Sequence, residues 1–466
     1  MSQLALSSID LSIIDEISSS KNEPNWLKEY RKSSLEIYNE LPQEVSPLYN
    51  KYSDAKRMDP KQVALSAISD SSFPDFLKKR LDEIKKENSI FQIGSNIHSV
   101  NILDEEKSSG LIISSIDDAL KDHSDLIQKT LESTNSNEDK YTALNNAAFN
   151  SGIFVYVPEN TVIEKPIHLI SSLSSDDIST ISRNIIVAEK NSRAKIIQEL
   201  YSSKTSKQQA YLELLNISMA ENSNIDLTTL QMMDQSSVNF STRRANIAQD
   251  SKINAYLGLF GTMLSRYRID YQLNGTGSSV NDAEVVFGNS DQSFDLNTTV
   301  NHNAQSTEGK VVEKSILKDT SKSLFKGMIR INEEAAHSSS FLSGRSILLD
   351  KGAKSDAIPG LEILTNDVKA THSASVAQID EEQIFYLGTR CLSRTEAERI
   401  IVEGFLEPLS RSMSHQVRAW IAYLIESKWQ DKELSINNDE QLKAIVEVEE
   451  TRYNENAEIE QHYKYR

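Results

Sequence analysis

The strand-like stretch VKATHSASV places a histidine where an apolar side chain is expected. Side chains two positions apart share one face of a strand, so His372 shares its face with the small residues Ala370 and Ala374. Val368 and Val376 extend this apolar row. A neutral imidazole is a good ligand for transition metals, but a hydrogen-bonded histidine in the core is the more common arrangement. The residues alone therefore favour a core histidine and leave a metal ligand open.

Two other features could carry chemistry. Cys391, the one cysteine, is either a thiolate ligand for a soft metal or a small buried apolar residue, and the second is favoured. Asp380, Glu381 and Glu382 precede a helical pattern, where carboxylates stabilise a helix start, so we interpret them as capping residues. The sequence lacks nucleophile elbows, phosphate-binding glycine loops and zinc motifs. We therefore expect a scaffold or a subunit and not an enzyme.

Composition narrows the class of protein. The chain has 466 residues, and its 50 basic and 68 acidic residues give a net charge of −18. This length indicates two or three domains, and the acidic balance disfavours nucleic acid as a partner. A single cysteine cannot form an internal disulfide, and no secretory leader or apolar run of about 20 residues is evident. We expect a soluble, cytoplasmic protein without a membrane contact.

The periodicity of the apolar residues divides the chain into four parts. Residues 1–145 are mostly helical in period, with a few short strands, and residues 146–378 contain strand after strand separated by polar turns. Residues 379–430 are helical again, and residues 431–466 form a charged tail, either a solvated helix or partly disordered. Because no crossover helix separates the central strands, a stacked β architecture is predicted, either a β-helix or a large sandwich.

Three stretches resemble the SufB/SufD family of iron–sulfur cluster assembly proteins. They are KNEPNWLKEYRKSSLEIY, ALNNAAFNSGIFVYVPENTVIEKPIHL and the run from GRSILLDKGAK to IIVEGF. The third contains the family's P-x-LEI, dVK-x-sH, D-x-x-x-x-FYL-x-x-R and GF elements in order. The resemblance implies a mainly β fold, a right-handed parallel β-helix core with helical N-terminal and C-terminal segments.

The resemblance also implies a role. Such a chain is a scaffold subunit of the SUF complex that pairs with SufB and docks the SufC ATPase, which alone uses ATP. A nascent, transient iron–sulfur cluster forms at the SufB–SufD interface. SufB-type proteins have a cysteine near the position of Ala353 and a glutamate at the position of Ser373, and both are missing here. The chain is therefore SufD-like, and His372 matches the SufD histidine thought to hold the cluster at the subunit interface.

Further expectations follow from this resemblance. The strands at 361–363 and 368–376 are predicted to form the SufB interface, and the helices at 381–429 to dock the ATPase. Aromatic side chains dominate interfaces, so Phe385, Tyr386 and Phe405 are the expected docking residues. Three alternatives remain: a SufB-like homologue, a homodimeric scaffold that pairs with itself, and a carbohydrate-acting β-helix enzyme. The last is disfavoured because no cluster of Asp, Arg or Lys marks such a site.

Overall fold

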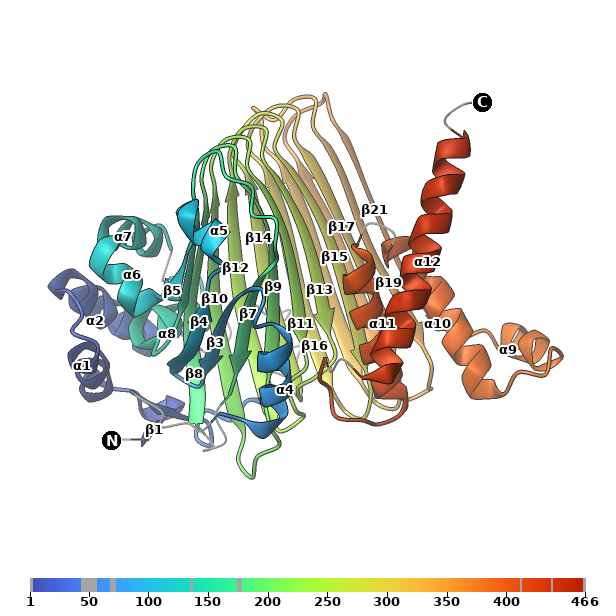
Figure 1. Cartoon of the computed structure of the whole chain (residues 1–466), viewed down its shortest axis with the longest axis horizontal. Helices are drawn as coiled ribbons and strands as arrows, with labels where there is room; N and C mark the ends of the chain where they lie inside the picture. Colours follow the sequence, from blue (N-terminus) through green and yellow to red (C-terminus); the bar gives the residue numbers. More distant parts are fainter. Residues whose placement is uncertain are drawn as a thin grey trace.

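The computed structural model describes residues 3–42, 57–67, 73–134, 137–173, 178–410, 413–436 and 439–463. Its centre is a long β-solenoid with helical segments at both ends (Figure 1). The predicted fold class, a parallel β-helix core flanked by helices, is confirmed. None of the described helices combines the length and the apolar character that crossing a membrane requires.

The N-terminal part is mixed helix and short strand, as its sequence predicts. Its elements are β1 (Gln3–Ala5), η1 (Leu6–Ser8), α1 (Leu11–Ser20), α2 (Asn25–Glu40), β2 (Ala64–Ser66), α4 (Asp75–Glu83), β3 (Asn88–Ile93), β4 (Asn96–Asn101), α5 (Asp104–Ser108), β5 (Ile112–Ser115), α6 (Ile116–Asp122), α7 (Ser124–Glu132) and α8 (Lys140–Ala148). Asp139 caps α8 by accepting hydrogen bonds from the backbone N–H groups of Tyr141 and Thr142, at 2.8 and 3.1 Å.

The solenoid is built from two parallel sheets that the chain visits alternately. Its strands are β6 (Ile153–Val157), β7 (Ile167–Ser172), β8 (Ile178–Ala188), β9 (Arg193–Tyr201), β10 (Gln209–Met219), β11 (Asn224–Gln231), β12 (Ser237–Ile247), β13 (Lys252–Leu259), β14 (Leu264–Leu273), β15 (Ser279–Gly288), β16 (Ser293–His302), β17 (Glu308–Leu317), β18 (Lys322–Ile331), β19 (Ser339–Leu348), β20 (Lys354–Ile363) and β21 (Lys369–Gln378). The even-numbered strands from β8 to β20 form one sheet, here called the even sheet, and the odd-numbered strands from β7 to β21 form the odd sheet.

Polar turns define where one strand ends and the next begins. Asn160, Asn191 and Asn222 recur at the same corner of successive turns, each with a positive φ between 56° and 58°. Asparagine tolerates this left-handed conformation better than most residues do. The side chain of Asn191 donates to that of Asn160 at 2.7 Å, and Asn222 donates to Asn191 at 2.8 Å. The amide groups therefore form a short ladder that holds the first turns in register.

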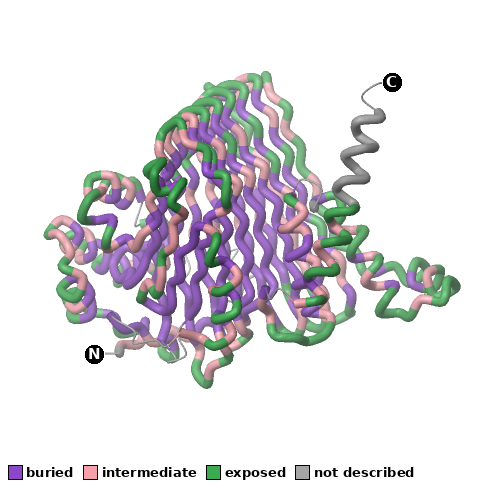
Figure 2. The backbone as a smooth tube through the Cα atoms, in the orientation of Figure 1, coloured by how far each residue is buried: buried purple, intermediate pink, exposed green. Residues whose placement is uncertain are grey.

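Three apolar layers stabilise this arrangement. Buried side chains fill the space between the two sheets, and Figure 2 shows buried residues concentrated along the middle of the solenoid. The N-terminal helices cover the outer face of the even sheet near β8 and β10. The C-terminal helices, together with α4, cover the outer face of the odd sheet. The solenoid therefore has helices against both outer faces.

The C-terminal part is helical, and its first two helices begin at capping residues. Its helices are α9 (Glu381–Gly388), α10 (Arg394–Ser410), α11 (His415–Trp429) and α12 (Glu440–Tyr463). Asp380 accepts a hydrogen bond from the N–H of Glu382 at 2.9 Å, which confirms its capping role. A capping box is present at the start of α10, because Ser393 and Glu396 bond each other's backbone N–H groups at 3.3 and 2.7 Å.

Candidate functional site

The solenoid ends in two open strands. β20 is the last strand of the even sheet and β21 is the last strand of the odd sheet, and each pairs with a neighbour on one side only. Along a strand, successive backbone N–H groups point to opposite sides. The N–H of Lys369 donates to Ser338, in the preceding turn, at 3.0 Å. The N–H groups of Ala370, His372 and Ala374 therefore point to the free edge, where they are available to another chain.

His372 lies on this open end and faces the direction of the solenoid interior. It is in register with Leu342 of β19, a fully buried core residue. Ala370 packs partly against the interior core, and Ser373 donates to Ser343 on the other face at 3.0 Å. The predicted alternation along this strand is therefore confirmed.

The burial of His372 differs from that of a core histidine. No further turn of the solenoid covers it, so the imidazole is exposed and has no hydrogen-bond partner among the described residues. The interpretation that the bare sequence favours, a hydrogen-bonded core histidine, is wrong for this chain. The ring is free to bind a ligand that approaches the open end.

Apolar side chains surround the same end. Phe341, Ile363, Leu364 and Val376 are 37%, 40%, 54% and 43% exposed. Some charges at this end pair with one another, such as Arg330 with Glu362 at 3.0 Å on the even sheet. An open strand edge with exposed apolar residues is a template for association with another chain. The open end is therefore a surface on which another chain could pair, and it carries a free imidazole.

The described residues contain no group of three or more His, Cys, Asp or Glu side chains that could hold a metal ion. Thiolates are the usual ligands of iron–sulfur clusters. Cys391 is exposed in the turn after α9, where its φ is 65°. The interpretation of Cys391 as a small buried apolar residue is therefore wrong. His372 could supply one ligand, and further ligands would have to come from another chain.

Two buried histidines were not singled out from the sequence. His302 of β16 lies inside the solenoid and bonds the hydroxyls of Thr307 at 2.7 Å and Ser340 at 3.1 Å. Burial lowers the pKa of His302 to about 4, so the ring is neutral. The in–out alternation of SFDLNTTVNH, which turns Leu296, Val300 and His302 to one face, is the signal that could have found it.

The second, His168, ties three parts of the chain together. Its ring bonds Glu199 of β9 at 3.2 Å and Glu87 at 2.5 Å, and Arg80 of α4 bonds both oxygens of Glu199, at 2.6 and 3.0 Å. Burial lowers the pKa of His168, but the two carboxylates outweigh this effect and raise it overall. Trp420 of α11 packs edge-on to the ring. These residues are far apart in sequence, and no spacing signal could have joined them.

The three aromatic residues predicted to dock a partner lie in different surroundings. Phe385 and Tyr386 on α9 are 75% and 57% exposed, and α9 projects away from the solenoid (Figure 1). Phe405 on α10 is instead partly buried against the odd sheet, where its ring lies 4.8 Å from the amine of Lys314. The lysine also donates to the carbonyl of Phe405. Two of the three residues are therefore available to a partner, whereas the third holds α10 to the solenoid.

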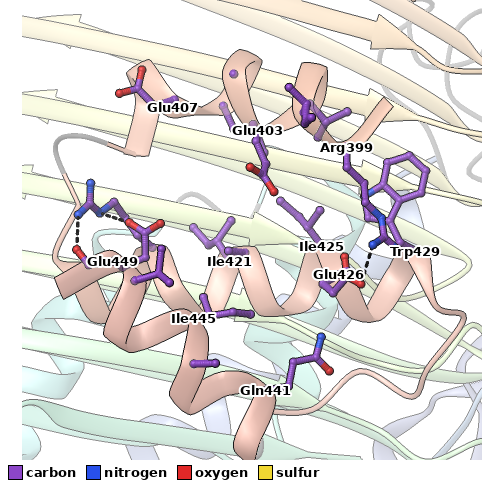
Figure 3. Close-up of a pocket in the computed structure, with 18 residues that line it drawn as sticks. Arg399, Glu403, Glu407, Ile421, Ile425, Glu426, Trp429, Gln441, Ile445 and Glu449 are labelled. Atoms are coloured by element: carbon purple, nitrogen blue, oxygen red, sulfur yellow. Dashed lines mark hydrogen bonds and ion pairs between the residues drawn. The ribbon is translucent and has the colours of Figure 1, made fainter. Parts of the chain in front are cut away.

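A groove of about 720 Å³ opens between α10, α11 and α12 (Figure 3). Ile421, Ile425 and Ile445 form part of its apolar floor. Ion pairs join its walls: Arg399 of α10 with Glu426 of α11 at 3.1 Å, and Arg418 of α11 with Glu449 of α12 at 3.3 Å. The C-terminal helices therefore form one packed unit with a hollow outer surface.

Comparison with known sequences identifies the family. The profile of the SufBD core domain, described as a domain of SUF system FeS cluster assembly, matches residues 171–405, and the profile of the SufBD N-terminal region matches residues 85–169. The chain belongs to the SufBD family. The iron–sulfur cluster assembly protein SufD of Bacillus subtilis (strain 168) is 27% identical over 430 residues, which cover 90% of this chain and 98% of that protein.

A second SufBD relative is similar over a slightly shorter part of the chain. An iron–sulfur cluster assembly SufBD family protein of Staphylococcus aureus (strain MRSA252) is 26% identical over 412 residues, which cover 86% of this chain and 89% of the relative. The family resemblance inferred from the sequence motifs is therefore confirmed. Both SufBD profile matches together extend from the strands near α4 to α10 and include the whole solenoid.

Proposed function

We propose that this chain is a SufD-like scaffold subunit that pairs with a SufB-type protein through β20 and β21. The open end of the solenoid carries this proposal, because it combines unpaired backbone groups, exposed apolar residues and an unpartnered imidazole. The likeness to SufD of B. subtilis supports the SufD assignment. A SufB-like role fits less well, since the cysteine and the glutamate of SufB-type proteins are replaced near Ala353 and at Ser373.

At this interface His372 would contribute one ligand to a nascent iron–sulfur cluster, with thiolates from the SufB-type partner. Neutral imidazole is a competent ligand for iron, and a cluster held by few ligands from each chain can be released after assembly. The exposed position of His372 supports access from a partner. The cluster is cargo for this chain and not a resident cofactor.

We also assign docking of a SufC-type ATPase to the C-terminal helices. Phe385 and Tyr386 project from α9 into solvent, and large aromatic residues are the side chains that most often anchor an interface. ATP is then bound and used by the partner alone. A conformational change in the ATPase would be transmitted to the solenoid through α10 and α11, because these helices pack against the odd sheet.

Pairing through the open strands is tested with Ala370→Pro. This N–H points to the free edge, so proline removes a donor to the partner and leaves the ladder to β19 intact. We expect co-purification with the SufB-type partner to be lost, while the circular dichroism spectrum of the isolated chain stays unchanged. Ala370→Ser keeps the N–H and is the matched control. Full yield of the complex with Ala370→Pro would show that this edge is not the interface.

A further inference from the structure

The interior of the solenoid is not uniformly apolar. A column of polar side chains runs between the two sheets, and in its first half the charges are compensated. Glu213 of β10 accepts hydrogen bonds from Asn184 at 2.8 Å, Ser241 at 2.5 Å and Arg243 at 3.2 Å. All of these residues are buried. The buried carboxylate is therefore paired with a guanidinium and satisfied by neutral donors.

The second half of the column contains three carboxyl groups without a cation of their own. They are Asp282 and Glu284 of β15 and Glu313 of β17, each no more than 1% exposed. Glu284 and Glu313 are directly in register on neighbouring parallel strands, so their side chains stack on the same face. The interior cation on the neighbouring turns, Arg243, is already bound to Glu213.

Each of these carboxyls receives one hydroxyl hydrogen bond. Tyr271 donates to Asp282 at 3.0 Å, Thr298 donates to Glu284 at 2.5 Å, and Ser315 donates to Glu313. The second oxygen of each group, Oδ1 of Asp282 and Oε2 of both glutamates, has no N–H or hydroxyl donor among the described residues. Buried oxygens rarely stay unsatisfied. A proton on the carboxyl groups themselves supplies the missing donor.

Charge repulsion favours the same conclusion. Two ionised carboxylates side by side in a low-dielectric interior cannot both persist. Burial raises the pKa of Asp282 to about 7 and that of Glu313 to about 8, and burial together with the Asp282 charge raises the pKa of Glu284 well above its usual value. The other ionisable groups that face the same interior are Glu213, Arg243, Tyr211, Tyr267, Tyr271 and His302.

Hydroxyl pairs lead from Glu313 to the open end. Ser315 of β17 lies 3.1 Å from Ser323 of β18, and one turn further on Ser346 of β19 lies 2.7 Å from Ser355 of β20. The two pairs stack, because Ser315 is in register with Ser346, and Ser323 with Ser355. Ser355 is half-buried on the last strand of its sheet. Hydroxyls both donate and accept, so each pair can pass a proton, and the stacking of the pairs places the next hydroxyls on the neighbouring strands.

We propose that Asp282, Glu284 and Glu313 form an internal proton store that exchanges protons with the open end of the solenoid through the serine pairs. In each transfer a carboxyl O–H bond breaks, its proton passes to a hydroxyl oxygen whose own proton moves on, and a carboxylate remains. No electron is exchanged. Resting on the proposed function, the store would supply protons to the thiolates that are freed at the open end when an assembled cluster leaves, because a ligand that no longer binds metal can bind a proton again.

The store is tested on the isolated full-length chain without iron, so the outcome does not depend on cluster assembly. Infrared difference spectra report the C=O band of protonated carboxyls. We expect this band at pH 6, with loss as the pH is raised to about 9. Glu284→Gln and Glu313→Gln, which resemble the protonated acid in shape, should each remove part of the band. Glu308→Gln, an exposed position on β17, is the control.

The route is tested by the rate at which the band responds to a pH jump. Ser323→Ala and Ser346→Ala should slow the response severalfold without changing its end point. Ser343→Ala, whose hydroxyl lies outside the column, should leave the rate unchanged. Absence of a titrating band in the wild-type chain, or a band untouched by both glutamine variants, overturns the store. An unchanged rate in both serine variants overturns the route.

Discussion

Lys428 provides a quantitative test of how the C-terminal helices attach to the solenoid. Its side chain is buried between α11 and the odd sheet, and its amine donates to the carbonyl of Phe260 at 2.6 Å and to Oε1 of Gln292 at 2.5 Å. Burial lowers the pKa of Lys428 to about 7 from its ordinary 10.5. The amine therefore loses a proton near neutrality when the helices are docked, and regains it when they detach.

The sign of the effect follows from proton binding. Between about pH 7 and pH 10.5 the unfolded chain holds a proton on Lys428 that the folded chain lacks, so the free energy of unfolding rises with pH. With the folded pKa near 7, this contribution grows by about 2 kcal/mol between pH 7 and pH 9. Below pH 7 both states are protonated, and the contribution stays at its minimum.

The perturbation is Lys428→Met, which keeps the length of the side chain and removes its charge. Gln292 Nε2 still donates to the carbonyl of Phe260 at 3.4 Å, and the N–H of Asn289 still donates to Gln292 Oε1 at 3.1 Å, so neither acceptor is left without a donor. We expect the wild-type chain to gain about 2 kcal/mol relative to the variant between pH 7 and pH 9.

The assay is urea unfolding followed by tryptophan fluorescence. The chain has three tryptophans, and two of them, Trp420 and Trp429, lie on α11. A Trp26→Phe background therefore makes the fluorescence report the attachment of α11. Lys432→Met, at an exposed position after the same helix, is the matched control and should keep the wild-type pH slope. Equal slopes for wild type and Lys428→Met would refute a deprotonated buried amine at this contact.

Two further predictions concern the ends of the molecule. Arg31→Met should lower the free energy of unfolding by about 3–5 kcal/mol in urea titrations. The side chain of Glu23 is 1% exposed and would lose its ion-pair partner, which lies at 2.6 Å. A loss below about 1 kcal/mol would contradict this reasoning. Replacing the exposed Phe385 and Tyr386 by serine should abolish pull-down of the ATPase and leave the stability of the chain unchanged. Phe405→Ala should instead lower stability, because Phe405 packs against the odd sheet. Normal pull-down by the double variant would exclude α9 as the docking element.

Local sequence patterns predicted a stacked β architecture, because each strand carries its own in–out alternation and each turn its own polar residues. They left a β-helix and a sandwich open, and the β-helix was implied by the family resemblance. The same patterns placed His372 correctly on its face. They could not predict its exposure, because burial depends on whether another turn follows. A strand that closes a stack has the same alternation as one inside it.

Sequence patterns could not predict the contacts between segments that are far apart in the chain. The contacts among Arg80, His168 and Glu199 join α4 to two solenoid strands and depend on which turns stack. The position of Cys391 was misjudged for a related reason: a small thiol after an apolar helix suggests burial, but α9 projects from the body and leaves the turn in solvent. Spacing along the chain carries no information on either point.

The central claim is that His372 at the open end helps to hold a nascent cluster shared with a SufB-type partner. It is tested most directly by purifying the complex with the partner and the ATPase, supplying iron and sulfide, and measuring the charge-transfer absorbance of the cluster. His372→Ala should leave the complex intact and reduce cluster formation at least tenfold. Thr371→Ala, on the opposite face of the same strand, should match the wild type. Cluster formation by His372→Ala at the wild-type rate would contradict the claim.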